Sequence, residues 1–283
     1  MDGVQLPFAE IPSMSSEKPD DRERGYSLED LVKPDLPALP GMVDTPDRGE
    51  DVLDLMTADL LAQALDCTHR FGSFHMAFSG SEGLDGLCRR MMFDPDLRRF
   101  PWDRTHLWIS DDRCVPRNDP LSCYGRLRES LIIPAGIPLS QVHAIPSTDE
   151  SADEIMHARI ETELSDRLRG EGHLDCVILD VDDRGRIAGL FPGEDAILEK
   201  GRHLRFTRNS VPDEDEFWIS LTLPIINDAR MIQVLVQGKA AGSALERQVA
   251  SPRPAIEFPA AGLMESDRIL KWYFDQEAAS AGA

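Results

Sequence analysis

Short runs of apolar residues alternate with amphipathic segments along most of this chain, and this alternation limits the possible fold more than any other feature. The clearest run, LDCVIL at residues 174–179, is continuously apolar, as in a strand that is buried on both faces of a sheet. Shorter runs at 74–78 and 105–109 are each followed by a polar or glycine-containing loop and then by helical periodicity. The alternation predicts an α/β fold, a Rossmann-like three-layer sandwich with a mostly parallel central sheet.

The remaining elements follow from the same periodicities. The apolar residues at 53, 56, 60 and 64 form one stripe of a helix predicted over residues 50–71. Further helices are predicted within 84–92, 123–132, 151–170 and 239–249, and a terminal amphipathic helix within 266–278. Further strands are predicted within 142–146, 217–224 and 231–238.

The N-terminal segment has a different composition from the rest of the chain. Residues 1–48 are rich in proline, with acidic and serine-rich runs, which is typical of a flexible or surface-wrapping extension. We therefore predict an extension over residues 1–48 and an α/β domain over residues 49–283. Such an extension also offers a surface for a protein partner.

Charge and cysteine content exclude several classes of partner. The net charge of −21 at pH 7 repels phosphate backbones and anionic lipids, so neither nucleic acid nor a membrane is expected to bind. The N-terminus has no basic segment followed by an apolar stretch, and the five cysteines show no CxxC spacing. These features predict reduced thiols and a cytoplasmic location. The seven histidines show no i,i+4 pair, so no metal site is predicted.

Three loops are the places to look for a site, because ligands bind beyond the carboxyl ends of the strands in open α/β sheets. They follow Phe78, Ile109 and Leu179. The middle loop carries two adjacent aspartates and then Arg113, and the last carries aspartates and arginines between residues 180 and 186. Charged side chains at such strand ends are candidates for a functional role.

The middle loop, HLWISDDRCVPRNDPLSCYGRLRESL, resembles a loop of the 6-phosphogluconolactonase family in which a strand runs into Asp-Glu-Arg, then Val-Pro, then Ser-Asn-Tyr-Gly. Three other segments fall in family order. FHMAFSGSEGL is similar to the sugar-phosphate loop, and LDCVILDVDDRGRIAGLFPG to the segment with Gly-Met-Gly and then Asp-Gly-His-Thr-Ala-Ser-Leu-Phe-Pro-Gly. FWISLTLPIINDARMIQVLVQG is similar to a strand pair that begins Thr-Leu-Thr-Leu-Pro-Val-Ile-Asn. The resemblance covers residues from about 50 to about 275.

The resemblance implies hydrolysis of 6-phosphoglucono-lactone to 6-phosphogluconate in the pentose phosphate pathway, an ester hydrolysis that needs no cofactor. The expected ligand is a small phosphorylated sugar or lactone. The matching positions imply Ser79, Gly80 and Ser122 as substrate-binding residues, with Arg113 supplying positive charge at the reacting carbonyl. A base would come from Asp111 or from Asp182.

The departures from the family pattern lie mainly at the positions that would carry out the reaction. The family histidine that activates water is replaced by Arg186, whose guanidinium cannot lose a proton at usable pH. An aspartate two residues earlier is replaced by Arg184. Because arginine binds phosphate bidentately, Arg184 and Arg186 are predicted to form a relocated anion site. Alternatively, the chain is a catalytically inactive or repurposed family member that acts in sugar-phosphate binding or in regulation. An amino-sugar phosphate isomerase or deaminase is a further alternative.

Each candidate also has a structural interpretation. Asp111 and its neighbour Asp112 can cap their loop or pair with the adjacent arginine. Ser79 and Gly80 can serve only the turn from strand to helix. The two arginines of the last loop can simply neutralise its aspartates.

Overall fold

The computed structural model describes residues 36–46, 51–149, 151–165, 172–211, 214–265 and 268–281. Most of the predicted N-terminal extension, and with it the predicted contact with a protein partner, lies outside these residues. Among the helices of the described residues, none has the length and apolar character needed to cross a membrane.

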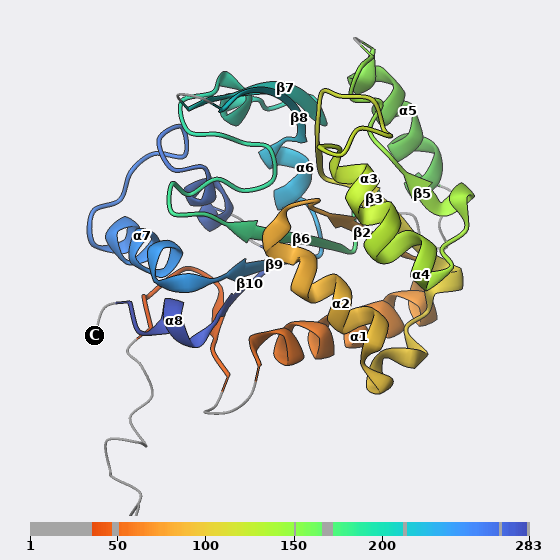
Figure 1. The fold of residues 1–283 in the computed structure, drawn as a ribbon, viewed down its shortest axis with the longest axis horizontal. Helices are drawn as coiled ribbons and strands as arrows, with labels where there is room; N and C mark the ends of the chain where they lie inside the picture. Colours follow the sequence, from red (N-terminus) through yellow and green to blue (C-terminus); the bar gives the residue numbers. More distant parts are fainter. Residues whose placement is uncertain are drawn as a thin grey trace, which may run out of the picture. The chain divides into compact units, whose positions relative to one another are not determined.

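Seven strands form the central sheet, in the order β1-β10-β9-β6-β2-β3-β5 (Figure 1). Each of the neighbouring pairs is parallel. Buried apolar side chains on both faces explain the continuous apolar runs in the sequence. The strands are β1 (Met42–Asp44), β2 (Phe74–Phe78), β3 (Thr105–Ile109), β5 (Val142–His143), β6 (Cys176–Val181), β9 (Met231–Val236) and β10 (Ile269–Phe274).

Helices cover both faces of this sheet, which confirms the predicted α/β fold. The helix α1 begins after Asp51, whose side chain accepts a hydrogen bond from the backbone of Leu53, and ends at Gly72 with a φ of 87°. The helices are α1 (Val52–Phe71), α2 (Asp85–Phe93), α3 (Cys123–Leu127), α4 (Ile133–Ala135), α5 (Ala152–Ser165), α6 (Leu223–Asn227), α7 (Gly238–Ala250) and α8 (Gln276–Ala279).

A second sheet of three antiparallel strands has the order β4-β8-β7. Its strands are β4 (Asp111–Arg113), β7 (Leu204–Val211) and β8 (Glu214–Leu221). A single residue, Ser110, separates the end of β3 from the start of β4, and β4 pairs with β8. The chain therefore passes directly from the central sheet into the small one. The sequence predicted a strand near β8 but not this separate sheet.

The predicted terminal helix is wrong. Residues 269–274 form β10, which lies between β1 and β9, and only the short α8 follows. Leu270, Trp272, Tyr273 and Phe274 are all buried, whereas an amphipathic helix would expose one face. The β1 strand, in a segment assigned to the extension, was also not predicted.

Candidate functional site

The carboxyl ends of β6, β2 and β3 lie next to one another. Phe78 at the end of β2 is paired with Ile109 on one side and with Ile178 on the other. The pairing continues past the strands, since the Ser79 N–H donates to the carbonyl of Ile178 and the Ser110 N–H to that of Phe78, both at 3.1 Å. The three loops predicted to form the site therefore start side by side.

A cavity of about 360 Å³ lies where these loops meet the three-stranded sheet. It contains five of the predicted site residues, whereas Ser79, Asp111 and Ser122 are fully buried and do not line it. Four arginines and three carboxylates dominate its lining, which consists of Gly80, Ser81, Glu82, Arg113, Arg126, Asp182, Arg184, Arg186, Phe191, Asn209, Glu216 and Trp218.

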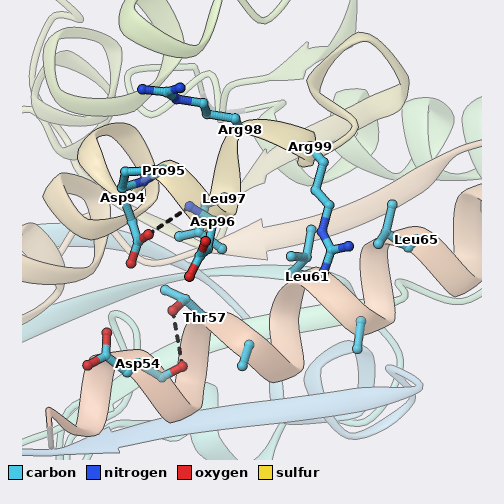
Figure 2. Close-up of a pocket in the computed structure, with 12 residues that line it drawn as sticks. Asp54, Thr57, Leu61, Leu65, Asp94, Pro95, Asp96, Leu97, Arg98 and Arg99 are labelled. Atoms are coloured by element: carbon cyan, nitrogen blue, oxygen red, sulfur yellow. Dashed lines mark hydrogen bonds between the residues drawn. The ribbon is translucent and has the colours of Figure 1, made fainter.

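A wider cavity of about 930 Å³ lies between α1 and residues 94–99 (Figure 2). Its polar groups are used locally: the hydroxyl of Thr57 donates to the carbonyl of Asp54 at 3.2 Å, and Asp94 accepts from the backbone of Asp96 at 2.9 Å. The lining of this cavity includes no predicted site residue. We therefore assign the candidate site to the smaller, arginine-lined cavity.

Asp182 organises the loop after β6. Its Oδ1 accepts hydrogen bonds from the backbone N–H groups of Arg184 and Arg186, both at 2.9 Å. Its Oδ2 accepts from Nε of Arg186 at 3.2 Å and lies 3.9 Å from a guanidinium nitrogen of Arg184. The turn requires glycine at Gly185, because φ is +78° and a Cβ would lie 2.3 Å from the ring of Phe258. The loop is thus folded around one carboxylate that faces the cavity.

Arg186 occupies the position expected for the catalytic base. Its Nη1 donates to the carbonyl of Ala188 at 2.8 Å, in addition to its bond to Asp182. Burial lowers the pKa of Arg186, but the negative charges of Asp180, Asp182 and Asp111 outweigh burial and raise it above its ordinary value. Arg186 therefore stays positively charged and cannot accept a proton from water.

Arg113 is held rigidly against the cavity wall. Its Nε donates to Glu216 at 3.0 Å, its Nη1 donates to the carbonyl of Leu121 at 3.0 Å, and its guanidinium lies 4.4 Å from the ring centre of Trp218. The indole N–H of Trp218 donates to the same oxygen of Glu216, at 3.0 Å. This arrangement fixes a positive charge at the cavity wall without using all of the donors of Arg113.

Asp111 lies behind the cavity. Its side chain is fully buried, and Oδ1 accepts from the hydroxyl of Ser110 at 2.6 Å. Among the residues that the structure describes, its Oδ2 has no hydrogen-bond partner. Burial raises the pKa of Asp111, although Ser110 and the positive charge of Arg186 act in the opposite direction. Asp111 is thus outside the cavity lining, and its role as a base stays a prediction.

Asp112 and Ser122 build the start of α3. Asp112 accepts from the backbone of Cys123 at 2.7 Å and from the hydroxyl of Ser122 at 3.2 Å. Ser122 is the N-cap residue, and its side chain accepts from the backbone of Gly125 at 3.1 Å. A structural role for Asp112 and Ser122 in capping this loop and helix fits these hydrogen bonds. Substrate binding by Ser122 stays a prediction.

The loop after β2 combines a buried serine with a glycine that lines the cavity. The hydroxyl of Ser79 accepts from the backbone of Ser81 at 3.3 Å. A Cβ on Gly80 would lie 2.2 Å from the Cβ of Cys123, so only glycine fits against α3. The hydroxyl of Ser81 donates to Asp180 at 2.6 Å and so ties this loop to the one after β6.

Sequence reasoning missed several lining residues, among them Arg126, Asn209 and Glu216. Arg126 lies one helical turn after Ser122, a spacing that places it on the side of α3 near its N-terminus. Asn209 and Glu216 come from β7 and β8 and are paired in register. Only the pairing of those strands brings them to the site, so no local motif could have identified them.

Comparison with protein families gives a match over residues 47–272 to the family described as glucosamine-6-phosphate isomerases/6-phosphogluconolactonase. The chain is 30% identical over 237 residues to the human GDH/6PGL endoplasmic bifunctional protein, covering 81% of this chain but only 29% of the human protein. It is 28% identical over 252 residues to a 6-phosphogluconolactonase of Streptomyces coelicolor, covering 84% of this chain and 95% of that protein.

Solved structures match the fold. The 6-phosphogluconolactonase from Thermotoga maritima superposes with a TM-score of 0.69 at 19% identity, covering 83% of this chain and 99% of that structure. A monomeric glucosamine-6-phosphate deaminase gives the same TM-score, 0.69, at 14% identity, covering 85% of this chain and 99% of that structure. Because both activities occur on equally similar structures, these matches establish the architecture and not the reaction.

Proposed function

The chain belongs to the glucosamine-6-phosphate isomerase/6-phosphogluconolactonase family, and from this we propose that it binds and hydrolyses a phosphorylated sugar lactone. The proposed substrate is 6-phosphoglucono-lactone and the product is 6-phosphogluconate, in line with the name 6-phosphogluconolactonase that the relatives carry. We place this reaction in the pentose phosphate pathway. The observation that carries the proposal is the cavity lined by four arginines in a chain whose net charge is −21. A local excess of arginine in an acidic protein favours an anionic ligand.

Arg126 and Arg184 are the proposed phosphate ligands. Arg184 has 40% of its side chain exposed, and Arg126 is paired at 3.0 Å with Glu82, which is 80% exposed. An exposed ion pair is weak, so a phosphate dianion can displace Glu82 from Arg126. Guanidinium groups bind phosphate through two parallel hydrogen bonds, which also fixes the orientation of the sugar.

The proposed reaction places the lactone carbonyl near Arg113 and Asp182. A water oxygen attacks the carbonyl carbon while Asp182 takes a proton from the water, and the oxyanion is stabilised by the fixed charge of Arg113. The bond from the carbonyl carbon to the ring oxygen then breaks, and that oxygen takes the proton held by Asp182 and becomes a hydroxyl, while the new carboxylic acid loses its proton to solvent. The hydrogen bonds to Asp182 from Arg184 and Arg186 use both lone-pair sites of Oδ1 and one of Oδ2, so one site of Oδ2 is left for the water.

A second candidate function, binding without turnover, is favoured by one specific observation. Each carboxylate that lines the cavity pairs with an arginine of the same lining: Glu82 with Arg126, Asp182 with Arg186, and Glu216 with Arg113. A carboxylate whose oxygens already accept hydrogen bonds from arginine has fewer lone pairs left to take a proton from water. In that case the protein is a sugar-phosphate binder or regulator built on the lactonase fold.

The test of the hydrolase proposal is formation of 6-phosphogluconate from the lactone by pure protein, above the spontaneous rate. We compare Asp182→Asn with Asp183→Asn, since Asp183 is the exposed neighbour of Asp182 and does not line the cavity. The proposal expects wild-type turnover, a loss of about 100-fold in Asp182→Asn, and less than a 3-fold change in Asp183→Asn.

The other outcomes are also informative. Absence of turnover together with saturable binding of 6-phosphogluconate would overturn the hydrolase proposal in favour of the binding function. Absence of both would reject each of the two candidates. Turnover that survives Asp182→Asn would remove Asp182 from the role of base.

We also propose a cytoplasmic location. The five cysteines are all free thiols, which suits a reducing compartment. Cell fractionation with a tagged full-length chain tests the location, and recovery in a membrane-enclosed oxidising compartment would contradict it.

A further inference from the structure

Histidines gather on one face of the central sheet, on the adjacent strands β2, β3 and β5. His75 on β2 is in register with His106 on β3, and Trp108 on β3 is in register with His143 on β5. The His75 and His106 rings stack at 4.2 Å, and the Trp108 and His143 rings stack at 3.9 Å. The stacking of His106 on His75, and of His143 on Trp108, fixes the positions of the His106 and His143 imidazoles.

Two of these imidazoles and one carboxylate converge on a common point. Nδ1 of His106 lies 3.0 Å from Nε2 of His143 and 3.6 Å from Oε2 of Glu163, which comes from α5. All three donor atoms lie within 4.8 Å of one another. The side chain of Glu163 is 35% exposed and that of His106 is 20% exposed, so an ion can reach the cluster from solvent.

We propose that His106, His143 and Glu163 form a zinc site with a fourth position open to water. Two imidazole nitrogens and one carboxylate oxygen are a donor set that zinc uses in proteins when one position is left to water. Two ligands of a tetrahedral zinc ion lie about 3.4 Å apart when each bond is about 2.1 Å. The separations of 3.0 and 3.6 Å bracket that value.

Zinc binding replaces one interaction in the cluster. The two imidazoles now share a hydrogen bond, so one of the facing nitrogens carries a proton. The ion takes the lone pairs of both facing nitrogens, and the proton moves to the other nitrogen of its own ring, so both imidazoles stay neutral. The guanidinium of Arg159 opposes binding through its charge, but its Nη1 is turned to the carbonyl of Ala144 at 3.3 Å.

A zinc ion at this site would stabilise the fold and would take no part in the proposed hydrolysis. It joins α5 to the β3 and β5 edge of the sheet, and none of its three residues is in the lining of the arginine cavity. A zinc ion there ties α5 both to β5, which precedes it in the chain, and to the more distant β3. Loss of the ion therefore should lower thermal stability and leave ligand binding in the arginine cavity unchanged.

The experiment is a titration of the chelator-treated full chain with Zn²⁺, in competition with a chromophoric chelator, repeated with Co²⁺ to read the coordination geometry from its absorption. We expect one equivalent of zinc, a tetrahedral cobalt spectrum and a zinc-dependent rise in melting temperature. Glu163→Gln and His106→Gln should each weaken zinc binding by at least about 10-fold.

His157→Gln is the matched control, because His157 is also on α5 and its Nδ1 lies 3.1 Å from Nδ1 of His203, but it is not in the cluster. Its zinc affinity should stay within about 3-fold of wild type. The proposal is overturned if no saturable binding occurs, if Glu163→Gln and His106→Gln both keep wild-type affinity, or if His157→Gln loses as much as they do. Because Glu163 is partly exposed, its substitution tests the site even if His106→Gln does not fold.

Discussion

Arg184 and Arg186 were predicted as a pair, and the structure separates their roles. Arg186 has only 16% of its side chain exposed and is bonded to Asp182 and to a backbone carbonyl, whereas Arg184 is 40% exposed. Arg186 thus serves mainly as the counter-ion of buried carboxylates, while Arg184 can turn to a ligand. Sequence spacing could not distinguish them, because two arginines separated by one glycine look equivalent until the turn is built.

This difference gives a prediction about stability. Arg186→Met should lower the free energy of unfolding by about 3 kcal/mol, because it leaves buried carboxylates without their counter-ion. Arg184→Met, from the same loop, should cost less than about 1 kcal/mol, since its ion pair is exposed. Urea unfolding of the two variants measures both values, and equal losses would contradict the assignment of Arg186.

A second prediction concerns Asp112 and pH. Burial raises the pKa of Asp112 from its ordinary value of 3.8 to about 6, against hydrogen bonds from Cys123, Tyr124 and Ser122. The folded protein therefore holds this proton more tightly than the unfolded chain does, so its stabilising contribution is complete below about pH 4. That contribution is lost as pH rises through about 6.

Asp112→Asn removes this titration. Between pH 4 and pH 7 the stability of wild type relative to Asp112→Asn should fall, as measured by urea unfolding at several pH values. A difference between the two proteins that is constant with pH, or one that grows with pH, would show that the folded pKa of Asp112 is not raised.

At the scale of elements, the sequence predicted the strands that carry the site and missed the sheet that completes it. The β2, β3 and β6 strands were predictable because their apolar runs are continuous and end in turn residues. The β10 strand was mistaken for a helix because a short apolar run mixed with charges fits both periods, and only its place between β1 and β9 decides. The β7 and β8 strands supply Asn209 and Glu216 through pairing that is not local.

The packing of the loop after β2 against α3 can be tested by a glycine-to-alanine substitution, which adds a single methyl group. Gly80→Ala should disrupt the cavity, because the new Cβ would lie 2.2 Å from the Cβ of Cys123. Gly86→Ala is the control, since its Cβ would meet only a side-chain methyl of Leu53 at 3.2 Å and alanine favours the helix that contains it. Gly80→Ala should lower the melting temperature by several degrees and Gly86→Ala should not, as differential scanning calorimetry would show. A normal melting temperature for Gly80→Ala would mean that the loop is free to move away from α3.

For the whole molecule, charge is the property that links fold to function. The chain carries a net charge of −21, yet four arginines face three carboxylates in the cavity lining. The fold and the family could be predicted because four motifs kept their order along the chain. The balance of charge in the cavity could not, because Arg126 follows the last matched position of the middle loop and Glu216 lies outside the recognised segments.

The measurement that tests the central claim most directly is calorimetric binding of 6-phosphogluconate beside gluconate, which lacks the phosphate. If the arginine cavity recognises a phosphorylated sugar acid, 6-phosphogluconate should bind at least about 10-fold more tightly, a difference of about 1.4 kcal/mol. Arg126→Met and Arg184→Met should each reduce that preference. Equal affinity for the two acids, or a preference that survives both substitutions, would contradict the account.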